Sequence, residues 1–297
     1  SAHNETCAAI GNLMWNWRMF LLTGESRFAD LAEETFYNSV LAGISLDGQS
    51  FFYTNTLRQL DDYPVALRWP RHRLTYFSCF CCPPNVLRNI AQIGGYACAL
   101  RDDALYITLY GQNVIQTRLR DGSAISLTQS SDYPWDGRIS LTLDTAPDRE
   151  LSVCLRIPGW CRSFAVSVND STVSAPEVRE GFVRPERHWR RGDKAGLPLG
   201  RPAETVEAHP LVEESLGQLA VRRGPIAYCL ESADLPVGVG VLDVSISADA
   251  GFDLSRIPEL ANGVALETTL AHRPRDRQST ALYRPARRIT TETIRAR

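Results

Sequence analysis

The chain has 297 residues, of which 44% are hydrophobic and 22% charged, and its 32 basic and 34 acidic side chains give a formal net charge of −2. This balance is typical of a globular protein with a sizeable core, and it argues against a basic surface for nucleic acid. No run approaches the roughly 18 consecutive apolar residues that a membrane-spanning helix needs. We therefore predict no membrane segment and a cytoplasmic location.

The first hundred residues are predicted to be helical. Apolar residues recur there at helical spacing, between residues that commonly begin or end a helix. The expected helices run from Asn4 to Gly24, from Ser26 to Gly43, and from Pro84 to about Leu100. Residues 45–82 lie between the second and third helices and are rich in aromatic and turn-forming residues. Loops of that length are uncommon unless they build a site.

From about residue 104 the apolar pattern changes to a period of two, which indicates β-strands. Turn sequences such as Asp121-Gly122 and Asp136-Gly137 separate the segments. The expected strands are 105–110, 114–119, 124–128, 139–143, 151–157 and 164–168, with a further hairpin formed by 218–222 and 226–230. Short strands at near-regular spacing predict an antiparallel sandwich.

Seven of the eight cysteines fall into two groups. Those in apolar helical or strand contexts are expected to be small buried hydrophobic residues, namely Cys98, Cys154, Cys161 and Cys229. Cys79, Cys81 and Cys82 instead crowd the start of the third helix. The partial positive charge of a helix N-terminus lowers a thiol pKa, so Cys81 or Cys82 is expected to reach the thiolate form near neutral pH.

A metal would strengthen that effect, because thiolates are soft ligands that suit zinc. Glu5 and Cys7, at the start of the first helix, offer a carboxylate and a further thiolate. Glu5, Cys7, Cys81 and Cys82 would complete one tetrahedral zinc shell. The spacing of these four residues in the sequence is compatible with three interpretations: a zinc site, a reactive cysteine without metal, or incidental buried thiols.

Several motifs resemble those of glycoside hydrolase family 127, the β-L-arabinofuranosidase family. They occur in the expected order over roughly residues 2–240. The motifs are Glu5-Thr-Cys-Ala-Ala-Ile-Gly11, Phe51-Phe-Tyr-Thr-Asn55, Cys79-Phe-Cys-Cys-Pro-Pro-Asn85, Leu155-Arg-Ile-Pro-Gly-Trp160, Trp189-Arg-Arg-Gly-Asp193, Ala208-His-Pro-Leu-Val212 and Val221-Arg-Arg-Gly-Pro-Ile-Ala-Tyr-Cys-Leu-Glu231.

The resemblance implies an α+β multidomain protein, in which the C-terminal helices of an (α/α)6 barrel are followed by antiparallel, jelly-roll-like β-sandwich domains. The expected domains are the end of the barrel with the zinc and cysteine site in residues 1–102, a β-sandwich in 103–240, and a β segment with an arginine-rich tail in 241–297. That tail carries a net charge of +6 from residue 271 onward, which leaves −8 on residues 1–270.

The resemblance also implies roles for particular residues. Glu5, Cys7, Cys81 and Cys82 correspond to zinc ligands, Cys81 to the nucleophile of a retaining glycosidase, and Tyr53 to a residue facing the sugar. The expected substrate is a plant-type glycan or oligosaccharide that carries β-L-arabinofuranose or a related sugar. No role is assigned to Cys79 or to His72, and the sequence leaves open whether the full-length parent forms a homodimer.

The family's general acid/base glutamate precedes the Glu-Thr-Cys motif, and only four residues precede Glu5 here. We therefore expect a fragment with little or no turnover by itself. Glu25, Glu33 and Glu34 are the nearest carboxylates in sequence, and they are expected to be solvated on a charged helix face. Two other functions remain open: a non-catalytic carbohydrate-binding sandwich and a zinc-stabilised structural module.

Overall fold

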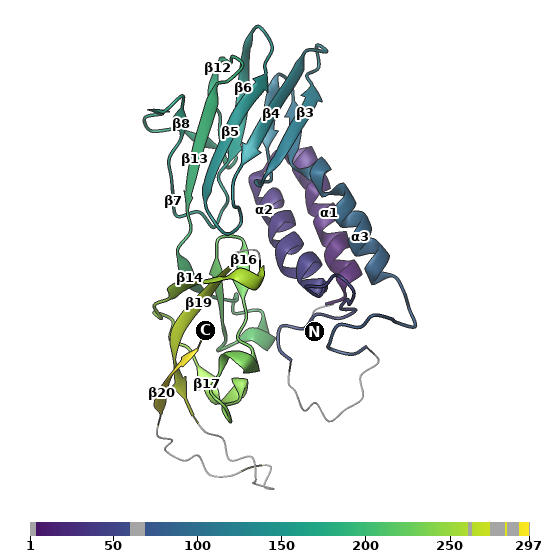
Figure 1. The fold of residues 1–297 in the computed structure, drawn as a ribbon, viewed down its shortest axis with the longest axis vertical. Helices are drawn as coiled ribbons and strands as arrows, with labels where there is room; N and C mark the ends of the chain where they lie inside the picture. Colours follow the sequence, from purple (N-terminus) through teal and green to yellow (C-terminus); the bar gives the residue numbers. More distant parts are fainter. Residues whose placement is uncertain (1–3, 60–68, 261–262, 274–282, 284–290, 297) are drawn as a thin grey trace. The chain divides into compact units, whose positions relative to one another are not determined.

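The computed structural model describes residues 4–59, 69–260, 263–273, 283 and 291–296 (Figure 1). The chain divides into two compact units, residues 1–201 and 202–297. The predicted three-part division, with boundaries after residues 102 and 240, stays a prediction. Among the described helices, none combines the length and the apolar character that crossing a membrane would require.

Two antiparallel helices begin the first unit (Figure 1). The helical elements are α1 (Thr6–Thr23), α2 (Ser26–Thr35), a π-helical turn (Phe36–Val40) and a 3-10 turn (Leu41–Gly43). Ile10, Leu13 and Trp17 form the buried stripe of α1 at helical spacing. Gly24 ends this helix in the left-handed conformation at a φ of 76°, and its N–H bonds to the carbonyl of Phe20. Both predicted helices are thus confirmed in outline.

The third helix differs from its prediction at both ends. The structure has α3 at Cys82–Gln92, followed by a 3-10 turn at Ile93–Tyr96 and by strand β1 at Cys98–Arg101. The predicted continuation to Leu100 is wrong. Two adjacent glycines, Gly94 and Gly95, lie in the 3-10 turn, where they weaken any further helix.

Two β-sheets follow in the first unit. The first sheet contains β1, β2 (Ala104–Ile107), β6 (Glu150–Arg156), β10 (Val178–Arg179), β11 (Phe182–Val183) and β12 (Glu186–His188). The second contains β3 (Asn113–Arg118), β4 (Ala124–Ser130), β5 (Arg138–Thr145), β7 (Ser163–Phe164), β8 (Ser167–Val168), β9 (Ser171–Thr172) and β13 (Lys194–Gly200). All the pairs are antiparallel except β2 with β6, which is parallel, so the predicted purely antiparallel sandwich needs that correction.

The period-two pattern explains how the layers stack. In β6, Val153 and Leu155 belong to the core shared by the two sheets. Cys154, between them, joins Trp17 and Phe20 of α1 in a second core on the opposite face of the same sheet. Because helices cover one face and a sheet covers the other, β6 is buried on both sides. The first unit is therefore built as helices, first sheet and second sheet.

A buried ion-pair network joins α2 to β6. Arg156 is completely buried, and its guanidinium donates to Asp30 and, at 2.6 Å, to Glu33 Oε1. The hydroxyl of Tyr133 donates to the same Glu33 oxygen at 2.7 Å, and Trp160 Nε1 lies 3.5 Å from Glu33 Oε2. Glu33 is only 1% exposed, so the expectation that it is solvated is wrong. Its carboxylate faces the sandwich because Arg156 compensates its charge there.

The second unit, residues 202–297, is formed by two small antiparallel sheets. One contains β14 (Ala203–Glu207), β15 (Leu219–Arg223) and β16 (Ile226–Tyr228), and the other contains β17 (Val244–Ser245), β18 (Asp253–Ile257), β19 (Gly263–His272) and β20 (Glu292–Ala296). Strands β15 and β16 pair as the predicted hairpin. Most of the arginine-rich tail lies outside the described residues.

The four cysteines that were predicted to be buried hydrophobic residues have different environments. Cys154 is completely buried, and Cys98 and Cys161 are half-buried. Cys229 is exposed, so the prediction is wrong for that residue. It lies directly after the short strand β16, and its sulfur is 3.9 Å from Glu231 Oε1.

Candidate metal and catalytic centre

Backbone hydrogen bonds hold the start of α1 against the loop that contains Tyr53. The N–H of Thr6 donates to the carbonyl of Tyr53 at 3.0 Å, and the N–H of Asn55 donates to the carbonyl of Asn4 at 3.1 Å. The Thr6 hydroxyl also donates to the carbonyl of Phe52 at 2.7 Å. The Glu-Thr-Cys and Phe-Phe-Tyr-Thr-Asn motifs, far apart in sequence, are therefore paired as two short extended segments.

The second half of the site is the start of α3. Cys81 occupies the N-cap position, and Cys82 is the first helical residue, with two prolines directly after it. Proline is well suited to the first turn of a helix because its φ is preset and it needs no hydrogen-bond partner for an N–H. The helix begins two residues before the predicted Pro84, which places both thiols at its N-terminal end.

The structure brings together all four residues that the sequence predicts as ligands. One ligand atom from each of Glu5, Cys7, Cys81 and Cys82 lies within 4.8 Å of the other three. The Cys7 and Cys82 sulfurs are 3.6 Å apart, and those of Cys81 and Cys82 are 3.8 Å apart. The Cys81 sulfur lies 3.6 Å from Glu5 Oε1.

These separations suit a single tetrahedral ion. With zinc–sulfur bonds of about 2.3 Å and a zinc–oxygen bond of about 2.1 Å, tetrahedral geometry places two sulfurs about 3.8 Å apart and a sulfur and an oxygen about 3.6 Å apart. The three measured pairs agree with that geometry. Three thiols and one carboxylate are also a donor set that zinc accepts. The residues present therefore fit a zinc ion.

The electrostatics of the thiols differ from the prediction. Burial raises the pKa of the Cys82 thiol, and its hydrogen bond to Cys7 raises it further. Burial is also the largest cause of the raised pKa of the Cys81 thiol. Burial of the two thiols thus opposes the effect expected from the helix N-terminus. A bound cation would reverse the balance, because coordination deprotonates a thiol.

Tyr53 lies beside this cluster among other aromatic rings. Its ring stacks on Trp69 at a centroid distance of 3.9 Å and meets Phe77 edge-on at 6.1 Å. Burial raises the pKa of Tyr53, and the nearby Glu5 and Cys81 add to that effect. Its hydroxyl is therefore a proton donor at neutral pH, and a hydrogen bond with Cys81 is among the causes of the shift.

The neighbouring residues without an assigned role are placed differently. Cys79 and His72 are exposed, and neither belongs to the four-residue cluster. Asn85, at the end of the Cys-Cys-Pro-Pro-Asn motif, had no predicted role, although its side-chain amide lies 3.1 Å from the Cys7 sulfur. Its position four residues after Cys81 was the available signal, because residues at that spacing share a helix face.

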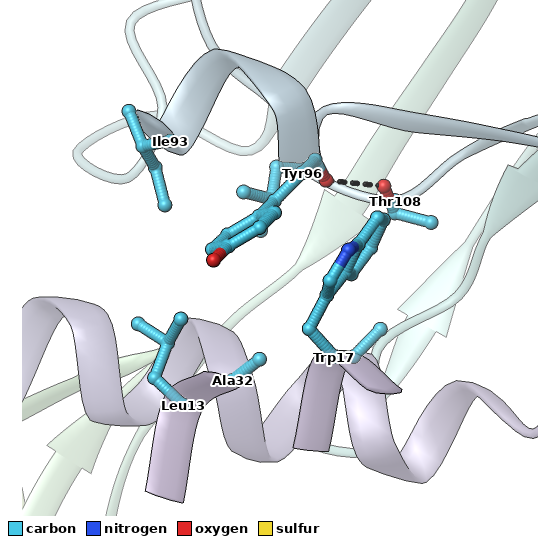
Figure 2. A pocket seen from close by; sticks show the side chains of 8 residues that line it. Leu13, Trp17, Ala32, Ile93, Tyr96 and Thr108 are labelled. Atoms are coloured by element: carbon cyan, nitrogen blue, oxygen red, sulfur yellow. Dashed lines mark hydrogen bonds between the residues drawn. The ribbon is translucent and has the colours of Figure 1, made fainter. Parts of the chain in front are cut away.

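An apolar cavity of about 10 Å³ lies elsewhere in the first unit, with room for roughly one water molecule. Figure 2 shows Leu13, Trp17, Ile93 and Tyr96 pointing toward it, with Ala32 and Thr108 completing the wall. None of the four clustered ligands lines this cavity, and it is too small for a sugar. The cysteine cluster thus remains the candidate centre.

The fold and the cluster define an α+β protein with a centre of three thiols and one carboxylate whose spacing fits a metal ion. Three family models match it in sequence order: the β-L-arabinofuranosidase GH127 catalytic domain over residues 1–95, the middle domain of the same family over 104–200, and the glycoside hydrolase family 127 C-terminal domain over 203–264. The chain therefore belongs to glycoside hydrolase family 127. This confirms the resemblance seen in the motifs.

Individual relatives agree with this assignment. The chain is 33% identical, over 79% of its length and 36% of the relative's, to a non-reducing end β-L-arabinofuranosidase of Bifidobacterium longum. A solved glycoside hydrolase is 42% identical with a TM-score of 0.91, and a family 127 β-L-arabinofuranosidase from Geobacillus stearothermophilus T6 is 35% identical with a TM-score of 0.87. Each of these two matches covers 99% of this chain. They cover only 49% and 47%, respectively, of the two solved structures.

Proposed function

We propose that this chain carries the zinc-binding and nucleophilic part of a retaining glycosidase that releases β-L-arabinofuranose, or a related sugar, from plant-type glycans. The observation that carries the proposal is the convergence of Glu5, Cys7, Cys81 and Cys82 within 4.8 Å. The names of the relatives supply the sugar, and the resemblance supplies the (α/α)6 barrel to which the helices would belong. The chain spans half or less of those relatives, so the activity is proposed for the whole enzyme.

Burial and contacts favour Cys81 over the other two thiols as the nucleophile. Cys82 is completely buried and cannot reach a substrate. Cys7 is half-buried, and its sulfur already accepts a hydrogen bond from Asn85. Cys81 is also half-buried and directly follows the exposed Phe80. The resemblance assigns the nucleophile to this first cysteine of the pair.

The proposed chemistry has two displacements. A Cys81 thiolate attacks the anomeric carbon and forms a carbon–sulfur bond, while the bond to the glycosidic oxygen breaks and that oxygen takes a proton from a general acid. Water then attacks the same carbon, loses a proton to the conjugate base, and returns the electron pair to sulfur as the carbon–sulfur bond breaks. Two inversions leave the anomeric configuration unchanged. Zinc, when bound, supplies the positive charge that keeps its thiol ligands deprotonated.

The neighbouring side chains can orient this reaction. Glu5 Oε1, 3.6 Å from the Cys81 sulfur, limits where that sulfur can lie. The raised pKa of Tyr53 keeps its hydroxyl protonated, so it can donate a hydrogen bond to Cys81 or to a sugar hydroxyl. The stack on Trp69 fixes the plane of the Tyr53 ring. We therefore propose Tyr53 as a substrate-facing residue.

The test uses a dinitrophenyl β-L-arabinofuranoside, whose leaving group needs little help from a general acid. We expect the zinc-loaded full-length enzyme, after a rapid acid quench, to carry the added mass of one pentosyl unit on Cys81, as mapped by peptide mass spectrometry. Cys81→Ser should abolish the adduct, whereas Cys79→Ser, two residues away and exposed, should leave it unchanged. Labelling of Cys79, or no adduct in a chain shown to contain zinc, would contradict the proposed nucleophile.

One observation favours a second function, a structural zinc module. Structural zinc sites have four protein ligands, whereas catalytic sites keep one position open, and this cluster offers four ligands. In that case zinc would stabilise the fold, and Cys81→Ser would leave the activity of the full enzyme intact. Loss of that activity in a variant that still folds and still binds zinc would exclude the purely structural role.

A further inference from the structure

The side chain of Asn85 bridges a proposed zinc ligand and a cation on the helix surface. Its Nδ2 lies 3.1 Å from the Cys7 sulfur, and its Oδ1 accepts a hydrogen bond from Arg88 Nη1 at 2.7 Å. Arginine only donates hydrogen bonds, so the atom facing Arg88 must be the amide oxygen. The amide nitrogen therefore faces Cys7. The orientation of the amide thus follows from the chemistry of its two neighbours.

A zinc ion in this cluster would need such a donor. Three thiolates and one carboxylate around a divalent cation leave a net charge of about −2 on the site. Backbone N–H groups commonly offset such charge at a helix start, but residues 83 and 84 of α3 are prolines and have none. The N–H of Asn85 is directed to the carbonyl of Cys81 at 3.3 Å. From the first turn of α3, the side-chain amide of Asn85 is the group that donates to the Cys7 sulfur, at 3.1 Å.

We propose that Asn85 is a positioning residue for the metal site: its amide donates to the Cys7 sulfur, stabilises that sulfur as a metal-bound thiolate and fixes its direction, while Arg88 orients the amide. The inference rests on the proposed function, in that it takes Cys7 to be a zinc ligand. Hydrogen-bond partners of this kind typically change metal affinity by about 10- to 100-fold when they are removed.

The critical variant is Asn85→Asp, which keeps the shape of the side chain and its bond to Arg88. It replaces the N–H donor with a carboxylate oxygen that repels the Cys7 thiolate. We expect zinc to bind about 10- to 100-fold more weakly in competition with a chromogenic chelator. In the cobalt-substituted protein, the sulfur-to-cobalt charge-transfer band should move to longer wavelength, because the sulfur has lost its donor.

Gln92→Glu is the matched control, since it makes the same amide-to-carboxylate change at an exposed position of α3. It should leave zinc affinity within about twofold of the wild type. Arg88→Leu keeps the donor but frees the amide, so it should weaken binding by only a few fold. Because Arg88 acts through the Asn85 amide, Arg88→Leu should cost less zinc affinity in an Asn85→Leu background, which lacks the amide, than it costs alone.

Circular dichroism of the chelated variants separates loss of metal affinity from loss of fold. An Asn85→Asp protein that folds, binds zinc as tightly as the wild type and keeps the cobalt band would overturn this inference and leave the zinc proposal standing. A wild-type protein that binds no zinc would overturn both. Equal weakening by Asn85→Asp and Gln92→Glu would show a general charge effect and would also overturn the role of Asn85.

Discussion

The first unit contains two buried polar clusters that handle charge in opposite ways. Around Arg156, two carboxylates, Asp30 and Glu33, meet a guanidinium within the chain. Around Cys82, three thiols meet one carboxylate, and in the described residues no cationic side chain is hydrogen-bonded to the sulfurs. In the first cluster a guanidinium of the chain itself offsets carboxylate charge, so we interpret that cluster as structural. In the second, a bound cation would offset the charge of the thiols once they lose their protons, so we interpret that cluster as functional.

The pKa directions support this contrast. Burial opposes the charge of Arg156, but Glu33 and Asp30 outweigh it and hold the pKa of the guanidinium above its usual range. For Cys81 and Cys82, burial dominates and raises the pKa of both thiols. Burial also raises the pKa of Glu33, but the Arg156 guanidinium and the Tyr133 hydroxyl oppose that rise. For Cys81 and Cys82, no cationic side chain is among the causes that oppose it.

The largest expected effect comes from breaking the balanced cluster. Arg156→Met removes the cation and leaves Glu33 and Asp30 facing it, at a cost of about 3–5 kcal/mol in the free energy of unfolding. Urea denaturation monitored by tryptophan fluorescence measures this loss of stability. Arg149→Met, which removes a half-buried arginine paired with the exposed Asp103 and Asp121, is the control and should have a much smaller effect. A small effect of Arg156→Met would contradict the interpretation of the Arg156 cluster as structural.

Zinc should stabilise the other cluster by mass action. At a free zinc concentration 100-fold above the dissociation constant, zinc raises the free energy of unfolding by about 2.7 kcal/mol. The gain should grow from about pH 5 to pH 8, because the thiols must lose protons to bind the metal. Denaturation with zinc and with chelator across this range tests the dependence, and a pH-independent gain would contradict thiolate binding.

The chelated protein should show the opposite slope at high pH. Cys81 and Cys82 have raised pKa values in the folded state, so they stay protonated above about pH 8.5, where thiols of the unfolded chain ionise. The unfolded state then binds fewer protons, and the free energy of unfolding falls as the pH rises. A Cys81→Ala/Cys82→Ala variant is the control, and its stability should fall less over the same interval.

A smaller effect is expected from Tyr133→Phe. It removes the 2.7 Å hydrogen bond to the charged Glu33, and bonds to charged groups contribute about 2 kcal/mol. Tyr110→Phe is the matched control, because that hydroxyl donates at 2.6 Å to the neutral carbonyl of Arg156 and should cost about 1 kcal/mol. Equal losses in thermal and urea unfolding would show that the charge of Glu33 adds nothing.

The smallest effect is expected for Cys79→Ser. Cys79 is exposed and lies outside the four-residue cluster, so zinc content and stability should stay within error of the wild type. Elemental analysis and thermal unfolding test this. A clear loss of zinc would extend the cluster to a fifth residue.

Local patterns in the sequence determined much of the fold. The period-two segments predicted most strands of the sandwich, and Gly24 marked the end of α1, because side-chain periodicity and a glycine stop both act over a few residues. The helix expected to reach Leu100 failed for the same reason. Its apolar spacing was compatible with a helix, but Gly94 and Gly95 weaken a helix there, and β1 pairs with β2 instead.

Only the tertiary structure decided which polar groups meet. The motifs named Glu5, Cys7, Cys81 and Cys82, but their convergence depends on backbone bonds between residues about fifty positions apart, such as Thr6 to Tyr53. Glu33 is a second example. The sequence around a helical glutamate does not distinguish one that faces water from one that faces a buried guanidinium. The spacing of residues in the sequence predicts which side chains share one face of a helix or strand. Which charged groups lie opposite that face depends on how the elements pack in the tertiary structure.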